Sequence, residues 1–239
     1  MTTPARTPDP GQATPLARTA APERLAAPAR AATAGAAPAP DWPALVSAAA
    51  IECSKVLARG AAQDWSRPAG DGDLEWSCRA TLDHLALGLV AYTGLLIAQP
   101  SDRFVTLFAS LDEQAPIPAC LEGIRIAATV LASTVRDAAP NARAWHPWGT
   151  SDAPGFAAMA VVELTVHTYD IARTLGLDWR PPDALAAPAL ARLFPEAPAP
   201  PEGPGAALLW CAGRATLPGL PRRTEWRWQG TVRPPGSTG

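Results

Sequence analysis

Apolar residues recur every three or four positions along four long segments, which is the spacing of buried or amphipathic helices. Residues that favour helix starts and ends flank these segments: Asp41 precedes the first, Gly60 ends it, and Ser77 precedes the second. The second segment is apolar on more than one face, so we expect its helix to be central. The four expected helices cover residues 41–60, 77–98, 117–137 and 154–175.

The connections between these segments differ in length. Residues 101–116 are too long for a tight turn and predict a crossover between the second and third helices that runs along the bundle. Beyond the fourth helix we expect a shorter helix at 184–193, a helical fragment at 206–211 and an aromatic, strand-like piece at 225–229. The pattern predicts an all-α fold: a four-helix bundle with a long crossover and a short C-terminal appendage.

The two ends of the chain differ from the middle in composition. Residues 1–40 are mostly Ala, Pro, Thr and Arg and contain no aromatic residue, so little apolar surface would offset the entropy lost on ordering. This segment predicts a disordered tail, with an organelle transit peptide as the alternative. We therefore expect a tail at 1–40, the bundle at 41–195 and a Pro- and Gly-rich appendage at 196–239.

Charge and hydropathy argue against two classes of partner. The formal net charge is -2, and Arg222-Arg223 is the densest basic run, which does not favour nucleic-acid binding. The longest apolar stretch, residues 85–98, is shorter than the roughly 20 residues that span a bilayer, so we expect a buried core helix and no membrane partner. Four scattered cysteines without CxxC spacing predict a thiol-reducing, cytoplasmic location.

Titratable residues stand out inside the apolar helices. Glu163 and His167 are four residues apart, so they share one face of the fourth helix, and Asp170 extends that stripe. His84 lies in the second helix. A lone buried carboxylate is costly, and a divalent cation between facing helices would satisfy the carboxylate and both imidazoles. Two nitrogens and one oxygen would also leave a coordination position open, as in catalytic zinc sites.

The residues alone leave alternatives open. Glu163 and His167 also fit a plain intrahelical ion pair, and Asp170 fits either a group that orients His167 or a simple polar contact. His146, between two tryptophans, is a candidate for a pocket mouth or a structural loop residue. Cys78 begins a helix, where a thiolate is favoured, but an inert small residue is the simpler interpretation.

Two separated motifs lie on the second and fourth expected helices. The first is Trp76-Ser77, three residues, then Thr81-Leu82-Asp83-His84-Leu85. The second is Val162-Glu163, three residues, then His167-Thr168-Tyr169-Asp170-Ile171-Ala172. Together they resemble the mycothiol-dependent maleylpyruvate isomerase family, over about residues 41–178. The resemblance implies a DinB-like metal-binding bundle in which His84, Glu163 and His167 hold a divalent metal, usually zinc.

The resemblance also implies an activity. The expected enzyme is a metal-dependent isomerase or S-transferase that uses mycothiol, a low-molecular-weight thiol, on a small electrophile. A metal-activated hydrolase and a non-catalytic metal- or thiol-binding protein are the alternatives, and a homodimer is left open. In the isomerase an α/β domain follows the bundle, whereas about 45 residues follow the short helix here. We therefore expect an appendage instead of a second domain, and the substrate is not assigned.

Overall fold

The computed structural model describes residues 39–232. The tail expected over residues 1–40 lies outside this range except for Ala39 and Pro40, as do the last seven residues of the expected appendage. Within the described range every regular element is helical, which confirms the predicted all-α class. The elements are α1 (Trp42–Ala58), the 3-10 turn η1 (Ala69–Gly72), α2 (Cys78–Ala98), α3 (Ile117–Asp137), α4 (Ala153–Thr174), α5 (Asp183–Leu193) and α6 (Pro204–Cys211).

Side-chain caps set the starts of three of the four long helices. The carboxylate of Asp41 accepts a hydrogen bond from the backbone N–H of Ala44 at 3.1 Å. Ser77 Oγ accepts one from the N–H of Ala80 at 3.1 Å, and Asp152 Oδ1 accepts one from Gly155 at 2.9 Å. Each bond satisfies a first-turn donor that the helix itself leaves unpaired.

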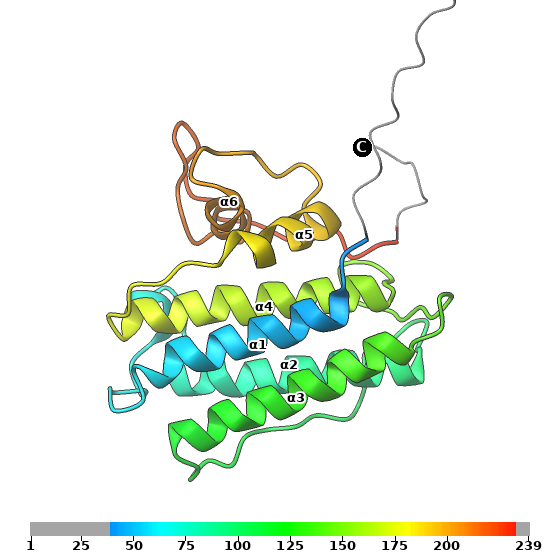
Figure 1. Cartoon of the computed structure of the whole chain (residues 1–239), viewed down its shortest axis with the longest axis horizontal. Helices are drawn as coiled ribbons and strands as arrows, with labels where there is room; N and C mark the ends of the chain where they lie inside the picture. Colours follow the sequence, from blue (N-terminus) through cyan, green and yellow to red (C-terminus); the bar gives the residue numbers. More distant parts are fainter. Residues whose placement is uncertain (1–38, 233–239) are drawn as a thin grey trace, which may run out of the picture. The chain divides into compact units, whose positions relative to one another are not determined.

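The four long helices form the predicted bundle, in which α1 and α2 each pack against both α3 and α4 (Figure 1). The central helix is α4, and the expectation that the second helix would be central is wrong. In α4, 18 residues are buried, against 11 in α2, because η1, α5 and α6 also cover α4. Polar side chains on α4 are therefore held inside protein.

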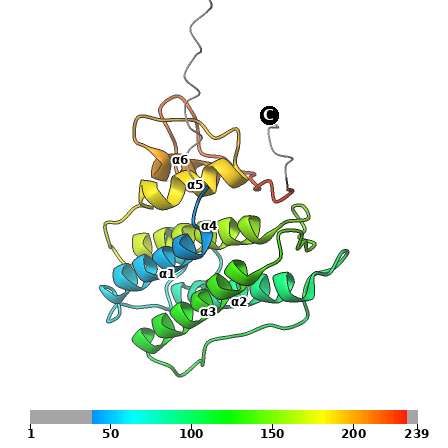
Figure 2. The ribbon, with the colours of Figure 1, turned by 45° about the vertical axis from the view of Figure 1, so that its right-hand side comes forward.

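The predicted crossover is confirmed: residues 99–116 return along α2. The N–H of Leu111 donates to Asp83 Oδ1 at 2.6 Å, and the Arg79 side chain donates to the carbonyl of Asp112 at 2.7 Å. Both partners lie near the start of α2, so α3 begins at the same end of the bundle as α2 (Figure 2). The crossover thus makes α2 and α3 parallel and leaves α2 antiparallel to α4.

Within residues 39–232, two helices, α2 and α3, are long and apolar enough to cross a membrane by length and composition. Their most apolar stretches are 56% and 39% buried inside the protein, respectively. Core helices of bundles meet the same criteria, so these features do not by themselves assign a membrane.

The C-terminal part packs as helix and loop. Both α5 and α6 contact α4, and they also contact each other. The expected strand-like piece at 225–229 is wrong, since the described residues contain no strand there. Trp228 is instead buried, with its ring centroid 4.5 Å from that of Trp148. The aromatic residues in this segment pack into a side-chain cluster, with no neighbouring strand to pair with. The boundary between the bundle and the appendage, expected after residue 195, stays a prediction.

Candidate metal centre

The structure brings His84 of α2 together with Glu163 and His167 of α4. Glu163 Oε2 lies 3.4 Å from His84 Nε2 and 3.1 Å from His167 Nε2. The three candidate ligand atoms all lie within 4.8 Å of one another. The i,i+4 spacing stacks Glu163 and His167 on one face of α4, and the packing of α2 against that face supplies His84.

Asp170 contacts the ring nitrogen of His167 that points away from Glu163, and Arg214 in turn binds Asp170. His167 Nδ1 lies 3.0 Å from Asp170 Oδ2, and Asp170 is 1% exposed. Arg214 binds the same carboxylate with two nitrogens, at 3.2 Å to Oδ1 and 3.0 Å to Oδ2. With Nδ1 directed at Asp170, Nε2 faces Glu163 and is the ring nitrogen placed to bind a metal ion. This contact favours the orienting role considered for Asp170 over a simple polar contact, and that role stays a prediction.

Sequence reasoning missed Arg214. It lies 44 residues beyond Asp170, in the segment after α6, and no local spacing connects the two. An indirect signal existed, because a buried aspartate next to a histidine needs a further donor or cation to balance its charge.

The next turn of α4 anchors the loop that leads into α2. Thr174 Oγ1 donates to the carbonyl of Pro68 at 2.9 Å and accepts from the N–H of Asp71 at 2.8 Å. At the other end of this loop the ring of Trp76 lies 4.7 Å from that of His84. The polar stripe of α4 thus positions both a candidate ligand and the loop that precedes His84.

The charges inside the site are strongly coupled. Burial alone would raise the pKa of the Glu163 carboxyl, yet hydrogen bonds from His167 and His84 hold it well below its usual range. Burial opposes a charged His167, but hydrogen bonds to Asp170 and Glu163 outweigh it and raise its pKa to about 9. Without a metal, His167 is therefore an imidazolium between the carboxylates of Glu163 and Asp170. Its positive charge occupies the place that a metal cation would take.

The donor set fits a divalent metal. Donors about 2.0–2.2 Å from a tetrahedral ion lie about 3.3–3.5 Å apart, close to the 3.4 and 3.1 Å measured from Glu163 to the two imidazoles. Two imidazole nitrogens and a carboxylate oxygen suit zinc and several other divalent ions. The His84 side chain is 32% exposed, against 16% for Glu163 and 11% for His167, so the site opens to solvent on the His84 side.

His146, with Asp170 one of the two catalytic candidates that the sequence offers, is surrounded by aromatic rings. Its ring centroid lies between 5.8 and 6.4 Å from those of five side chains, and Trp148 N–H donates to its Nδ1 at 3.1 Å. Burial lowers its pKa to about 4, and the charge of Glu163 opposes this shift only in part. These contacts agree with a structural loop residue. The five rings are Tyr92, Phe104, Trp148, Phe156 and Trp228.

The cysteines are free and buried, at positions 53, 78, 120 and 211. Burial raises the pKa of the Cys78 thiol, outweighing hydrogen bonding to Thr174, so the helix start does not make it a thiolate. This agrees with the interpretation of Cys78 as an inert residue.

Comparison with protein families identifies the bundle. The model of the mycothiol maleylpyruvate isomerase N-terminal domain matches residues 46–172, a little over half of the chain. That span contains both sequence motifs and all three candidate ligands. Comparisons with curated proteins and with solved structures gave no match. The chain therefore belongs to the mycothiol maleylpyruvate isomerase N-terminal domain family.

Proposed function

We propose that this protein is a metal-dependent, mycothiol-using enzyme, an isomerase or S-transferase acting on a small electrophile in the cytoplasm. His84, Glu163 and His167 would hold the metal, with zinc the expected ion. The observation that carries the proposal is a partly buried set of two nitrogen donors and one oxygen donor, open to solvent on the His84 side, in a family named for mycothiol maleylpyruvate isomerase.

The metal, when bound, would lower the pKa of a coordinating thiol, so that the thiolate is available at neutral pH. The protein's own residues would orient the metal ligands and the incoming molecule. Asp170, held by Arg214, would fix the tautomer and orientation of His167 as a ligand. Trp76, which is 47% exposed, lies against His84 on the open side and offers an apolar surface to an incoming ligand.

In the isomerase version of this chemistry, the thiolate adds to a cis carbon–carbon double bond conjugated to a carbonyl. The new carbon–carbon single bond rotates, and elimination of the same thiolate restores the double bond in the trans form. Every atom of the thiol is recovered, so no oxidant or reductant is required. In S-transfer the sulfur–carbon bond would be retained, and the carbon next to the carbonyl would take up the proton that the thiol lost.

The test is thiol binding that depends on the donor set. We expect mycothiol to raise the melting temperature of the metal-loaded full chain by several degrees and that of Glu163→Gln by much less. His146→Asn is the matched control, because it alters a buried polar residue outside the triad and should keep the response.

Two outcomes would redirect the proposal. Full metal loading without a response to mycothiol or to simple thiols would favour the non-catalytic metal-binding protein or the metal-activated hydrolase. Equal thiol responses in the native protein and Glu163→Gln would remove the triad from the proposal altogether.

A further inference from the structure

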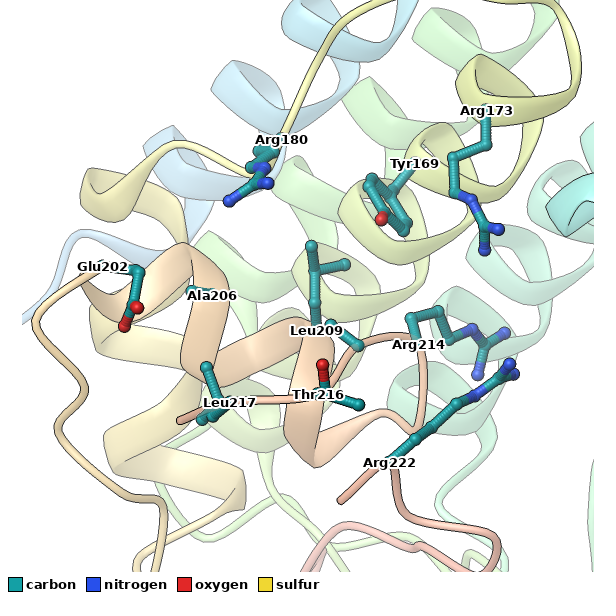
Figure 3. Close-up of a pocket in the computed structure, with 11 residues that line it drawn as sticks. Tyr169, Arg173, Arg180, Glu202, Ala206, Leu209, Arg214, Thr216, Leu217 and Arg222 are labelled. Carbon is teal, nitrogen blue, oxygen red and sulfur yellow. The ribbon is translucent and has the colours of Figure 1, made fainter. Parts of the chain in front are cut away.

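A polar cavity of about 570 Å³ lies on the α6 side of α4, outside the candidate metal centre (Figure 3). Its wall includes the last turns of α4, the α4–α5 connection, α6 and the segment that follows α6. Four arginines line it, together with one tyrosine and one carboxylate. These residues are Arg173, Arg180, Arg214, Arg222, Tyr169 and Glu202.

The carboxylates near this cavity are shared. Asp73 Oδ2 binds both Arg173, at 3.3 Å, and Arg222, at 2.9 Å. Asp170, which binds Arg214, also binds His167. Two guanidinium groups therefore share Asp73, and Arg214 shares Asp170 with an imidazole. The four arginines of the cavity outnumber the carboxylates beside it, which are Asp73, Asp170 and Glu202.

The cavity has two chemically different ends. In Figure 3 the guanidinium groups of Arg173, Arg214 and Arg222 gather at one end, and Arg180 and Glu202 lie at the other. The apolar surface between them comes from α6 and the loop after it, chiefly from Leu209 and Leu217. A ligand with an acidic group and a less polar body would match this arrangement.

The three gathered arginines are held before any ligand arrives. Arg214 also donates to the carbonyl of Ala212 at 2.8 Å and lies 5.4 Å from the ring of Trp226. Arg222 donates to the carbonyl of Gly213 besides its pair with Asp73. Side chains that are already ordered lose little entropy on binding, and guanidinium groups match the paired oxygens of carboxylates and phosphates.

We infer that this cavity binds a small organic anion, with its carboxylate or phosphate among Arg173, Arg214 and Arg222. The volume falls within the roughly 300–1,000 Å³ typical of small-molecule sites. The site is separate from the metal triad, because none of the three candidate ligands lines it. The chain Arg214–Asp170–His167 joins the two sites, although anion binding does not require the proposed thiol chemistry.

The test is calorimetric titration of the full chain with benzoate and with phenyl phosphate, which separate carboxylate from phosphate. Phenol is the neutral probe. We expect at least one anion to bind saturably, phenol not to bind, and Arg222→Gln to weaken binding about tenfold, the usual contribution of a charged hydrogen bond. Arg180→Gln, a change of an exposed side chain at the far end, should weaken it less.

Arg125→Gln is the matched control, since it removes the same charge from the exposed side of α3 and should leave binding unchanged. Circular dichroism of each variant checks its fold. Anion binding unchanged in both Arg222→Gln and Arg180→Gln would place the anion elsewhere, the metal included, and would overturn the inference. So would the absence of saturable binding by either anion.

Discussion

Two buried histidines of this protein have opposite surroundings. His167 lies between Glu163 and Asp170, and its pKa is raised to about 9. His146 lies among aromatic rings with Trp148 N–H as a donor to it, and its pKa is lowered to about 4. Their exposures are nearly equal, 8% and 9%.

The difference shows that burial alone does not make a histidine a candidate ligand. Burial disfavours the charged form of both imidazoles, and only His167 has carboxylates that reverse the effect. The pair also separates two tasks: His167 belongs to a polar site able to hold a cation, whereas His146 fills an apolar cluster. Four predictions test this separation, beginning with the largest expected effect.

The double variant His84→Ala/His167→Ala should lose its metal. The native chain, purified without an affinity tag, should carry about one divalent ion, because the three-donor site favours a single dication. Elemental analysis measures this directly, and His146→Ala should retain the metal. If added metal binds to metal-free native protein without raising its thermal stability, the site does not work as proposed.

Phe156→Ala should destabilise the aromatic cluster without removing the metal. Phe156 is 0% exposed, and truncation of a buried phenylalanine costs about 3–5 kcal/mol of unfolding free energy. Denaturant unfolding gives the value. Phe108→Ala is the control, since Phe108 is 58% exposed and its truncation should cost little. Loss of metal from folded Phe156→Ala protein would contradict the separation of the two regions.

Asp170→Asn should weaken metal binding about 10- to 100-fold, the usual effect of altering the hydrogen-bond partner of a histidine ligand. The asparagine keeps the size of the side chain but removes the charge that His167 and Arg214 share. Competition with a chromophoric chelator measures the affinity. The exposed Asp178→Asn serves as control, and equal affinities in the two variants would assign Asp170 a purely structural role.

The metal-free protein should lose stability on both sides of pH 6.5, for different reasons. Because folding raises the pKa of His167 from 6.5 to about 9, its contribution to the free energy of unfolding is complete below pH 6.5. That contribution is lost as the pH rises toward 9. Because folding lowers the pKa of His146 from 6.5 to about 4, its contribution to the free energy of unfolding is complete above pH 6.5. That contribution is lost as the pH falls toward 4. Each unit of pKa shift corresponds to about 1.4 kcal/mol.

Melting temperatures measured between pH 4.5 and 9 test this dependence of stability on pH. The lower limit stays above the ordinary carboxyl pKa of about 4. His167→Gln should flatten the alkaline side alone, and His146→Gln should flatten the acidic side alone. A variant that flattens the opposite side would reverse the assignment of the two environments.

Much of the fold could be predicted because its signals are local. A cap such as Ser77 satisfies a donor three residues away, and helical spacing aligns Glu163 with His167 whatever else surrounds them. The length of residues 101–116 was enough to predict the crossover. The aromatic piece at 225–229 was mistaken for a strand because β-propensity reports burial, and here the rings of Trp148 and His146 satisfy that burial.

By itself, the sequence determined the four helices, the shared face of Glu163 and His167, and the two motifs that identify the family. The tertiary structure alone decided that His84 reaches Glu163, that Arg214 binds Asp170 and that His146 packs among aromatic rings. The physical reason is range. Helical geometry fixes neighbours within one turn, whereas partners such as Arg214 meet only when packing brings distant segments together and selects the groups that burial can tolerate.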